Sequence, residues 1–281
     1  MLRLRSHDEL LAHSPHDPWI RWSLARPLRG EVWVHEDVAL VERLGRRRGF
    51  WVVPLRSGMP SAPGDSWVAA APGEDHASGS SSEPARVAAA LTALRDGGHL
   101  DRLASQSVSV PQAHAAVAHE VLDLADGGDW DWMWTTRAPA AHPAEAEVVE
   151  LDDLGDAAEL EAFSRRHNPR VWTEIGTGRV HRWVGIRDAD GALLAIGGAE
   201  AEDSGIPHLA GIVTDAGHRG HGLGTAVTAH LTRWSVEQHG ACTLGMFSDN
   251  AAARSVYDRL GYRTAHAWHS RGLAGRDQLP A

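Results

Sequence analysis

Hydrophobic residues in the second half of the chain recur at the spacings of helices and strands, in a clear order. Leu223, Val227 and Leu231 fall on one face of a helix over Gly222–His239, and Gly240 follows as a typical helix-ending residue. Short apolar runs bounded by turn residues lie on both sides of this segment, as expected for buried strands. The pattern therefore predicts an amphipathic helix between two strands of one sheet.

Residues 147–270 as a whole predict the order β-α-β-β-β-α-β-α-β, which is an α+β domain built on a mixed sheet. The predicted strands are Glu147–Leu151, Arg182–Arg187, Ala192–Ala199, His208–Thr214, Ala241–Phe247 and Tyr262–His269. The predicted helices are Asp153–His167, Gly222–His239 and Ala251–Leu260. An Asp-Ala-Asp-Gly sequence at 188–191 predicts a hairpin turn between two of the strands.

The first half predicts a second α+β domain with less regular patterning. Its predicted elements are the strands Glu31–Val34, Phe50–Leu55, Ser66–Ala70 and Trp130–Thr135 and the helices Glu83–Arg95 and Pro111–Asp123. The Gly/Ser-rich segment Pro72–Pro84 predicts a loop. Because Arg137–Glu147 is rich in Ala and Pro, we predict a linker there, with an N-terminal domain over residues 1–142 and a second domain over residues 143–281.

Composition narrows the classes of partner. The 281 residues carry a net charge of -10, and the basic residues other than histidine are all arginine. Such a chain would repel a polyanion, so we expect no nucleic acid and no membrane as partner, and an amine-bearing small molecule as substrate. No apolar run approaches the ~20 residues of a membrane span. Since the N-terminus lacks a signal-peptide pattern and the single cysteine excludes an intrachain disulfide, we expect a cytoplasmic protein. The sequence leaves a homo-oligomer open.

The candidate chemistry lies in the segment Thr214–Thr225, which reads TDAGHRGHGLGT and precedes the amphipathic helix. Glycines at 220, 222 and 224 let the backbone approach a ligand closely. The amides of the first helical turn lack intrahelical partners and lie at the positive end of the helix dipole. Arg219 adds a positive charge. Together these features predict a site for a phosphate or diphosphate group.

Two other glycine-loop classes fit less well. A dinucleotide-binding fold needs its loop near the start of the domain and an acidic residue at the next strand tip, but Phe247 leads to Ser248 and Asp249 here. An ATP-binding P-loop needs a lysine after the glycines, and none follows. We set both interpretations aside.

Two blocks of residues resemble the signatures of the GNAT superfamily of N-acetyltransferases. The first block is Arg219-x-x-Gly222-x-Gly224, and the second is Asn250-x-x-Ala253-x-x-x-Tyr257-x-x-x-Gly261-Tyr262. One predicted helix and one predicted strand separate them, which is the usual arrangement in that family. The resemblance implies a mixed, mostly antiparallel sheet flanked by helices. It also implies a transferase that moves an acetyl group from acetyl-CoA, its cosubstrate, to a primary amine by direct attack in a ternary complex.

The resemblance also assigns roles to residues. It implies that acetyl-CoA is bound by Ile212, Val213, Thr214, Arg219, Gly220, His221, Gly222, Leu223, Gly224, Thr225 and Asn250. Tyr257 matches the general acid that protonates the leaving thiolate. A backbone N–H near Val213 would polarise the thioester carbonyl. No metal is implied, since no His/Cys spacing resembles a zinc site.

The general base is open in the sequence, because the strand HLAGIVT carries no carboxylate. His208 is the first candidate, since the intrinsic pKa of histidine suits proton removal near neutral pH. Glu200 and Glu202, at the end of the preceding strand, are the alternatives. The missing carboxylate also keeps a second function open, namely a sensor or interaction module that binds acyl-CoA without turnover.

Three further interpretations concern residues outside the loop. Trp130, Trp132 and Trp134 alternate along a predicted strand, and we favour buried packing over a substrate pocket. Cys242 lies in an apolar run, which favours a small buried residue over a nucleophile. The first half has no comparable arginine-glycine loop before a helix, yet its strand-helix-strand order fits a degenerate copy of the same fold, as in tandem GNAT proteins. An unrelated substrate-binding domain is the alternative.

Overall fold

The computed structural model describes residues 1–45, 48–56, 82–170 and 172–276. The predicted strand Ser66–Ala70 and nearly all of the predicted loop Pro72–Pro84 lie outside the described residues. The chain divides into two compact units. Unit 1 comprises Met1–Trp132, Met246–Asn250 and Thr264–Ala281, and unit 2 comprises Met133–Gly245 and Ala251–Arg263.

These units do not follow the two continuous segments that the sequence suggests, because the chain's last strand belongs to unit 1. The segment Arg137–Glu147 lies within unit 2 and is held there, since Arg233 donates to the Pro139 carbonyl at 3.2 Å and forms an ion pair with Glu145. The division into domains over residues 1–142 and 143–281 therefore stays a prediction.

In unit 2 the elements follow the predicted order. Its strands are β7 (Val148–Leu151), β8 (Arg182–Arg187), β9 (Leu193–Ala201), β10 (Pro207–Thr214) and β11 (Cys242–Phe247), and its helices are α6 (Ala157–His167), α7 (Leu223–His239) and α8 (Ala251–Arg259). A short 3-10 helix, η2 (Pro143–Glu147), precedes β7, and another, η3 (Ala216–His218), follows β10. β7 to β10 pair antiparallel in sequence order, and β11 joins β10 in parallel. The mostly antiparallel mixed sheet is confirmed.

The two faces of the unit 2 sheet are covered by helices from different parts of the chain. α7 packs against β8, β9 and β10, as its apolar stripe predicts. α6 contacts β10, and beneath it Leu160 and Phe163 join Trp183, Ile196 and Val213 in one buried cluster. α6 begins four residues later than predicted, because Asp152–Asp156 forms a turn in which the Asp152 carboxylate accepts from the amides of residues 154 and 155.

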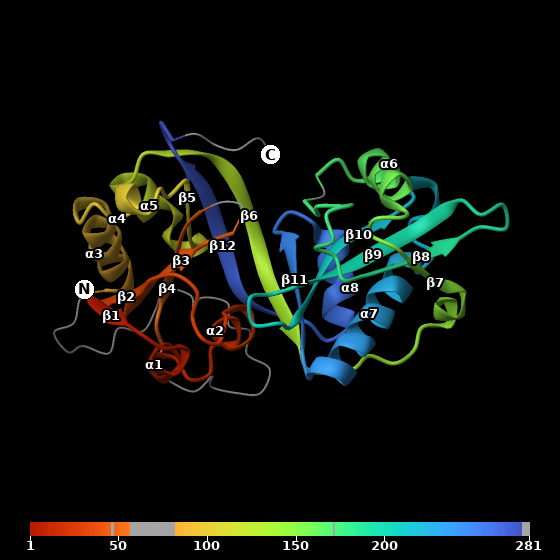
Figure 1. The fold of residues 1–281 in the computed structure, drawn as a ribbon, viewed down its shortest axis with the longest axis horizontal. Helices are drawn as coiled ribbons and strands as arrows, with labels where there is room; N and C mark the ends of the chain where they lie inside the picture. Colours follow the sequence, from red (N-terminus) through yellow and green to blue (C-terminus); the bar gives the residue numbers. More distant parts are fainter. Residues whose placement is uncertain (46–47, 57–81, 171, 277–281) are drawn as a thin grey trace. The chain divides into compact units, whose positions relative to one another are not determined.

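Unit 1 contains the rest of the chain. Its strands are β1 (Leu2–Leu4), β2 (Val32–His35), β3 (Val38–Arg43), β4 (Gly49–Pro54), β5 (Ser107–Pro111), β6 (Leu124–Thr135, which ends in unit 2) and β12 (Arg263–Leu273). Its helices are α1 (His7–His13), α2 (Pro18–Ser23), α3 (Glu83–Asp96), α4 (His99–Arg102), α5 (Ala115–Val121) and the 3-10 helix η1 (Gln112–His114). Figure 1 labels them along the chain. β12 pairs antiparallel with β5.

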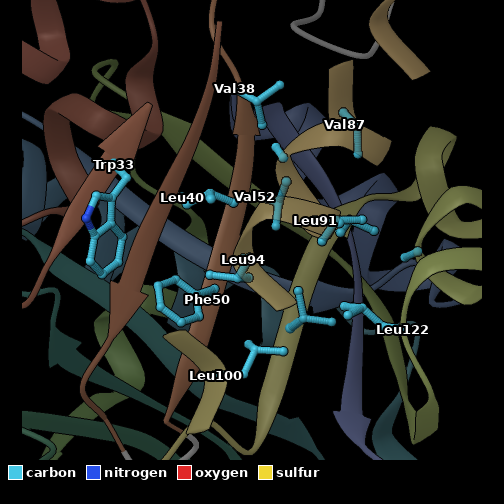
Figure 2. Packing of buried hydrophobic residues seen from close by; sticks show 14 of the residues in the cluster. Trp33, Val38, Leu40, Phe50, Val52, Val87, Leu91, Leu94, Leu100 and Leu122 are labelled. Atoms are coloured by element: carbon cyan, nitrogen blue, oxygen red, sulfur yellow. The ribbon is translucent and has the colours of Figure 1, made fainter. Parts of the chain in front are cut away.

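The core of unit 1 lies between the sheet and α3. Figure 2 shows Leu91 and Leu94 of α3 facing Val52 and Phe50 of β4, with Leu40 of β3 beside them. Leu91, Leu94, Leu40 and Val52 are completely buried. Burying a side chain of this size contributes about 1.5–3 kcal/mol. The predicted helix Glu83–Arg95 is thus confirmed as α3, and one apolar face of it packs into the core.

The element order of the first half of the chain repeats that of the second half. In both, a first strand pairs antiparallel with the second, helical structure separates the two, and three antiparallel strands follow. A helix then leads to a strand that pairs in parallel with the third of these, as β5 does with β4 and β11 with β10. A further helix and a long strand complete each series. The two halves of the chain therefore share one order of helices and strands and one position for the parallel pair.

Candidate functional site

The predicted phosphate loop connects β10 to α7 in unit 2. Gly220 and Gly222 have φ angles of 82° and 81°, in the left-handed region that glycine adopts without strain. Gly222 is the N-cap of α7 and makes no side-chain cap hydrogen bond. The amides of the first turn, which begins with Leu223, Gly224 and Thr225, therefore keep their donors available at the positive end of the helix. This arrangement fits a diphosphate.

The other end of the loop is fixed by hydrogen bonds that the sequence did not reveal. The Asp215 carboxylate accepts from the Gly217 amide at 2.8 Å and contacts His218 Nδ1 at 2.8 Å. His167, at the end of α6, accepts from the Ala216 amide through Nδ1 and lies 3.2 Å from Asp215 through Nε2. Bonding to His218 lowers the pKa of Asp215 and keeps its carboxylate charged.

Arg219 is exposed and also contributes to this anchoring. Its guanidinium donates to the His167 carbonyl at 2.7 Å. His221 Nδ1 lies 3.2 Å from the carbonyl of His218. Arg219 therefore joins the loop to the end of α6, and His221 contacts the loop itself.

The end of β10 separates from its parallel neighbour before the loop begins. β10 and β11 pair only at His208–Thr243 and Leu209–Leu244, although β10 continues to Thr214. Pairing with β9 shifts register between Ala210 and Val213, which marks a bulge. Among the described residues, the segment Ile212–Thr214 of β10 therefore has no strand partner on the side of β11, as the resemblance implies for the strand that contacts the pantetheine arm.

The ring of Trp183 packs against the bulge at Gly211. Gly211, at φ 63°, has no room for a side chain, because a Cβ there would lie 2.6 Å from the Trp183 ring. Trp183 is 1% exposed, and its indole N–H donates to Asp153 at 2.8 Å. The same carboxylate accepts from the amides of Gly176 and Gly178, at 3.2 and 2.6 Å. Asp153 therefore fixes both the residue under the bulge and the loop that precedes β8.

Replacing Asp153 with alanine should destabilise the protein by about 2–3 kcal/mol, because a buried indole N–H and two backbone amides lose their acceptor. Urea unfolding followed by tryptophan fluorescence measures the change. Asp258→Ala, an exposed position on α8, is the control and should change stability by less than about 0.5 kcal/mol. Equal stability of the two variants would contradict this role for Asp153.

His208 lies at the start of β10 among acidic groups. Its Nδ1 is 2.9 Å from Glu202 Oε1 and 2.9 Å from Thr243 Oγ1, and Glu200 is its cross-strand neighbour on β9. Burial disfavours the charged ring, but the charge and hydrogen bond of Glu202 and the charge of Glu200 outweigh burial and raise the pKa of His208 above 6.5. Burial in turn raises the pKa of Glu200.

Glu202 therefore acts on His208. A carboxylate that accepts from Nδ1–H leaves Nε2 as the ring's acceptor, which is how an orienting acid prepares a histidine base. The sequence placed Glu202 among the alternative bases; the structure places it as the partner of the first candidate.

Tyr257 lies on α8 with 7% of its surface exposed. Burial raises the pKa of its phenol to about 12. Among the described residues no hydrogen-bond partner of its hydroxyl is found, and its ring lies 5.9 Å from that of Tyr262. Tyr262 differs, because its hydroxyl is bonded to Thr232 at 2.7 Å and Cys242 at 3.1 Å. Asn250 directly precedes α8, and its amide donates to the Phe247 carbonyl, within unit 1.

The residues set aside in the sequence are part of the core. Cys242 is buried and unpaired, and burial raises the pKa of its thiol to about 11, which makes it a poor nucleophile. Trp132 is 1% exposed, and Trp130 packs on Trp51 at 5.7 Å and donates to Ser270. Buried packing is confirmed for Trp132, whereas Trp130 is half-buried. No helix among the described residues has both the length and the apolar character needed to cross a bilayer.

The sheet, the bulged strand and the glycine loop before α7 define the fold class of the GNAT acetyltransferases. Residues 146–262 match the family model of the acetyltransferase (GNAT) family, in agreement with the resemblance that the sequence motifs indicated.

Solved structures show the same fold over more of the chain. The chain resembles a GCN5-related N-acetyltransferase from Kribbella flavida, with 18% identity, a TM-score of 0.50 and 96% of each chain covered. A GCN5-related N-acetyltransferase from Sphaerobacter thermophilus has 13% identity, a TM-score of 0.50 and coverage of 87% of this chain and 79% of its own. At these identities the likeness concerns the fold.

One curated relative matches a similar length of sequence. An alpha-1,4-glucan:maltose-1-phosphate maltosyltransferase from Burkholderia pseudomallei is 29% identical over 127 residues, which is 45% of this chain. The chain spans 10% of the length of that relative. The match therefore describes a shared segment and carries no conclusion about the activity of either whole protein.

Proposed function

We propose that this protein is an acyl-CoA-dependent N-acyltransferase that moves an acetyl group from acetyl-CoA to a primary amine of a small molecule. The observation that carries the proposal is the uncapped N-terminus of α7, preceded by two left-handed glycines and by the bulged end of β10. The available amides suit a diphosphate, and the backbone of Ile212–Thr214, which pairs with β9 but not with β11, suits the amide-containing arm of coenzyme A. The residues present therefore fit the cosubstrate.

Acetyl-CoA supplies the activated acyl group, and the chain's own residues orient the reactants and move protons. His208, directed by Glu202, is suited to take a proton from the incoming ammonium through Nε2. Tyr257, held protonated by its high pKa, is suited to donate to the sulfur that leaves. Alignment of the two substrates in a ternary complex lowers the barrier further.

The alternative function is a sensor that binds acyl-CoA without turnover. The sequence favoured it only through the missing carboxylate on the fourth strand, and the Glu202–His208 pair supplies a carboxylate-supported base instead. The test is thiol release from acetyl-CoA in the presence of a panel of primary amines. Release above the rate without amine supports the enzyme; tight binding with no release from any amine supports the sensor.

Glu202→Gln is expected to move the rising limb of the kcat/KM pH profile to lower pH and to reduce the plateau about tenfold. A base works in its neutral form, so activity rises with pH through the pKa of His208, and Glu202 raises that pKa. Removing the carboxylate charge lowers the pKa of His208. The plateau falls because the orienting hydrogen bond at 2.9 Å is weakened.

Glu200→Gln is the matched control, because it removes a carboxylate charge near His208 without removing a hydrogen bond that orients the ring. Glu200 raises the pKa of His208 through its charge and makes no hydrogen bond to it. We therefore expect a smaller shift in the same direction with the plateau preserved. An unchanged profile in Glu202→Gln would exclude His208 as the base.

For the N-terminal half we propose a degenerate copy of the same fold that does not bind acetyl-CoA. The repeated element order and the matching parallel pairs β4–β5 and β10–β11 support this interpretation. The sequence of the first half contains no arginine-glycine loop before a helix. One cosubstrate per chain is therefore expected.

A further inference from the structure

His142 lies beside the phosphate loop, although it precedes the segment that matches the family model. A Cβ built on Gly222 would lie 3.0 Å from His142 Nε2 and 3.1 Å from its Cε1. The imidazole therefore occupies the space next to the N-cap glycine of α7. Both residues belong to unit 2.

The hydrogen bonds of the ring determine which nitrogen carries its proton. His142 is the N-cap of η2, and its Nδ1 accepts from the Ala144 amide at 3.2 Å. An acceptor nitrogen cannot carry the proton, so Nε2 is the N–H of the neutral ring. Among the described residues no partner of Nε2 is found, and the residue is half-buried rather than enclosed. A free donor thus lies at the loop.

The position of His142 is fixed by the rest of η2. Glu145 accepts from the His142 amide at 2.6 Å and completes a capping box. The same carboxylate is 8% exposed and forms an ion pair with Arg233 of α7. The capping box fixes His142 within η2, and the ion pair attaches η2 to α7. Because Gly222 is the N-cap of α7, the imidazole is thereby held at a fixed position beside Gly222.

We propose that His142 is a cofactor-binding residue whose Nε2–H donates a hydrogen bond to the diphosphate of coenzyme A. The inference rests on the proposed function, since it extends the same site by one side chain. Because the diphosphate is charged, this hydrogen bond is charge-assisted. It adds a side-chain donor to the backbone amides at the N-terminus of α7. A Cβ at position 222 would crowd this donor, in addition to the strain that a side chain meets at φ 81°.

The test compares two substitutions that separate the two ring nitrogens. His142→Asn keeps an acceptor near the Nδ1 position, and so keeps the η2 cap, but loses the Nε2 donor. His142→Gln keeps a donor near the Nε2 position and loses the cap. Calorimetric titrations of coenzyme A and of 3′-dephospho-coenzyme A, which retains the diphosphate, are run on both variants and on the wild type.

We expect His142→Asn to weaken the Kd of both ligands about tenfold and His142→Gln to stay within about threefold of the wild type. Unchanged or tighter binding in His142→Asn overturns the proposal. A loss seen with coenzyme A alone also overturns it, because the contact would then be to the 3′-phosphate. If the wild type binds neither ligand, the proposed function itself fails, which is a separate outcome.

Discussion

Replacing Tyr257 with phenylalanine is expected to lower kcat about a hundredfold while leaving the Kd of acetyl-CoA within about twofold. The substitution removes one hydroxyl and keeps the ring that packs beside Tyr262. Because that hydroxyl has no hydrogen-bond partner found among the described residues, its removal leaves no donor or acceptor of the protein unpaired. The variant should fold normally and lose only the chemistry that the hydroxyl performs.

The size of the effect follows from the acidity of the two groups. A thiol has a pKa of about 8.5, so a leaving thiolate is a weaker base than the phenolate of a tyrosine whose pKa is about 12. Tyr257 therefore remains protonated at neutral pH, and in the proposed mechanism it would donate a hydrogen bond to the developing thiolate. Proton transfer to a positioned reacting group contributes about 10²–10⁴ in rate, and we expect the lower end here.

Tyr262→Phe is the matched control. It removes the phenol of a residue just beyond the end of α8, whose hydroxyl is bonded to Thr232 and Cys242. This variant should lose about 1 kcal/mol of stability and retain kcat. Steady-state thiol release and thermal unfolding separate the two effects. A Tyr257→Phe enzyme with kcat within twofold of the wild type would remove Tyr257 from the mechanism.

Gly222→Glu is expected to raise the Kd of acetyl-CoA at least a hundredfold. A side chain at this position meets His142, strains a backbone at φ 81°, and places a carboxylate at the helix N-terminus where the diphosphate would bind. The three effects act in the same direction. Calorimetric titration measures the loss.

Gly240→Glu separates loss of the site from strain of the backbone. Gly240 ends the same helix at φ 79°, and a Cβ there meets nothing within 4 Å. The two variants should therefore suffer similar conformational strain, of order 1–3 kcal/mol, while only Gly222→Glu loses binding. Equal Kd values for the two variants would show that the loop does not hold the cosubstrate.

Local patterns sufficed for the loop and the elements around it. The helical stripe of α7, the glycines before it and the apolar run of β10 are all encoded within a few residues of one another, and each forms as predicted. The strand β5, Ser107–Pro111, is absent from the predicted elements, although its alternation of Ser and Val fits a strand and Ser109 is completely buried against Ser270 of β12.

The residues that support the site depend on contacts between distant segments. Asp153 and Gly211 are joined only through the ring of Trp183, and His142 reaches Gly222 only because η2 packs on α7. No periodicity or motif encodes such pairs. Glu202 was considered because it ends a strand, but its bond to His208 depends on the register of β9 against β10.

Titrating acetyl-CoA into the wild-type protein in a calorimeter tests whether this chain binds the cosubstrate. We predict saturable binding with one acetyl-CoA per chain and a Kd in the micromolar range, about -8 kcal/mol. An absence of saturable binding at millimolar acetyl-CoA would contradict it and leave a GNAT-type fold without its cosubstrate.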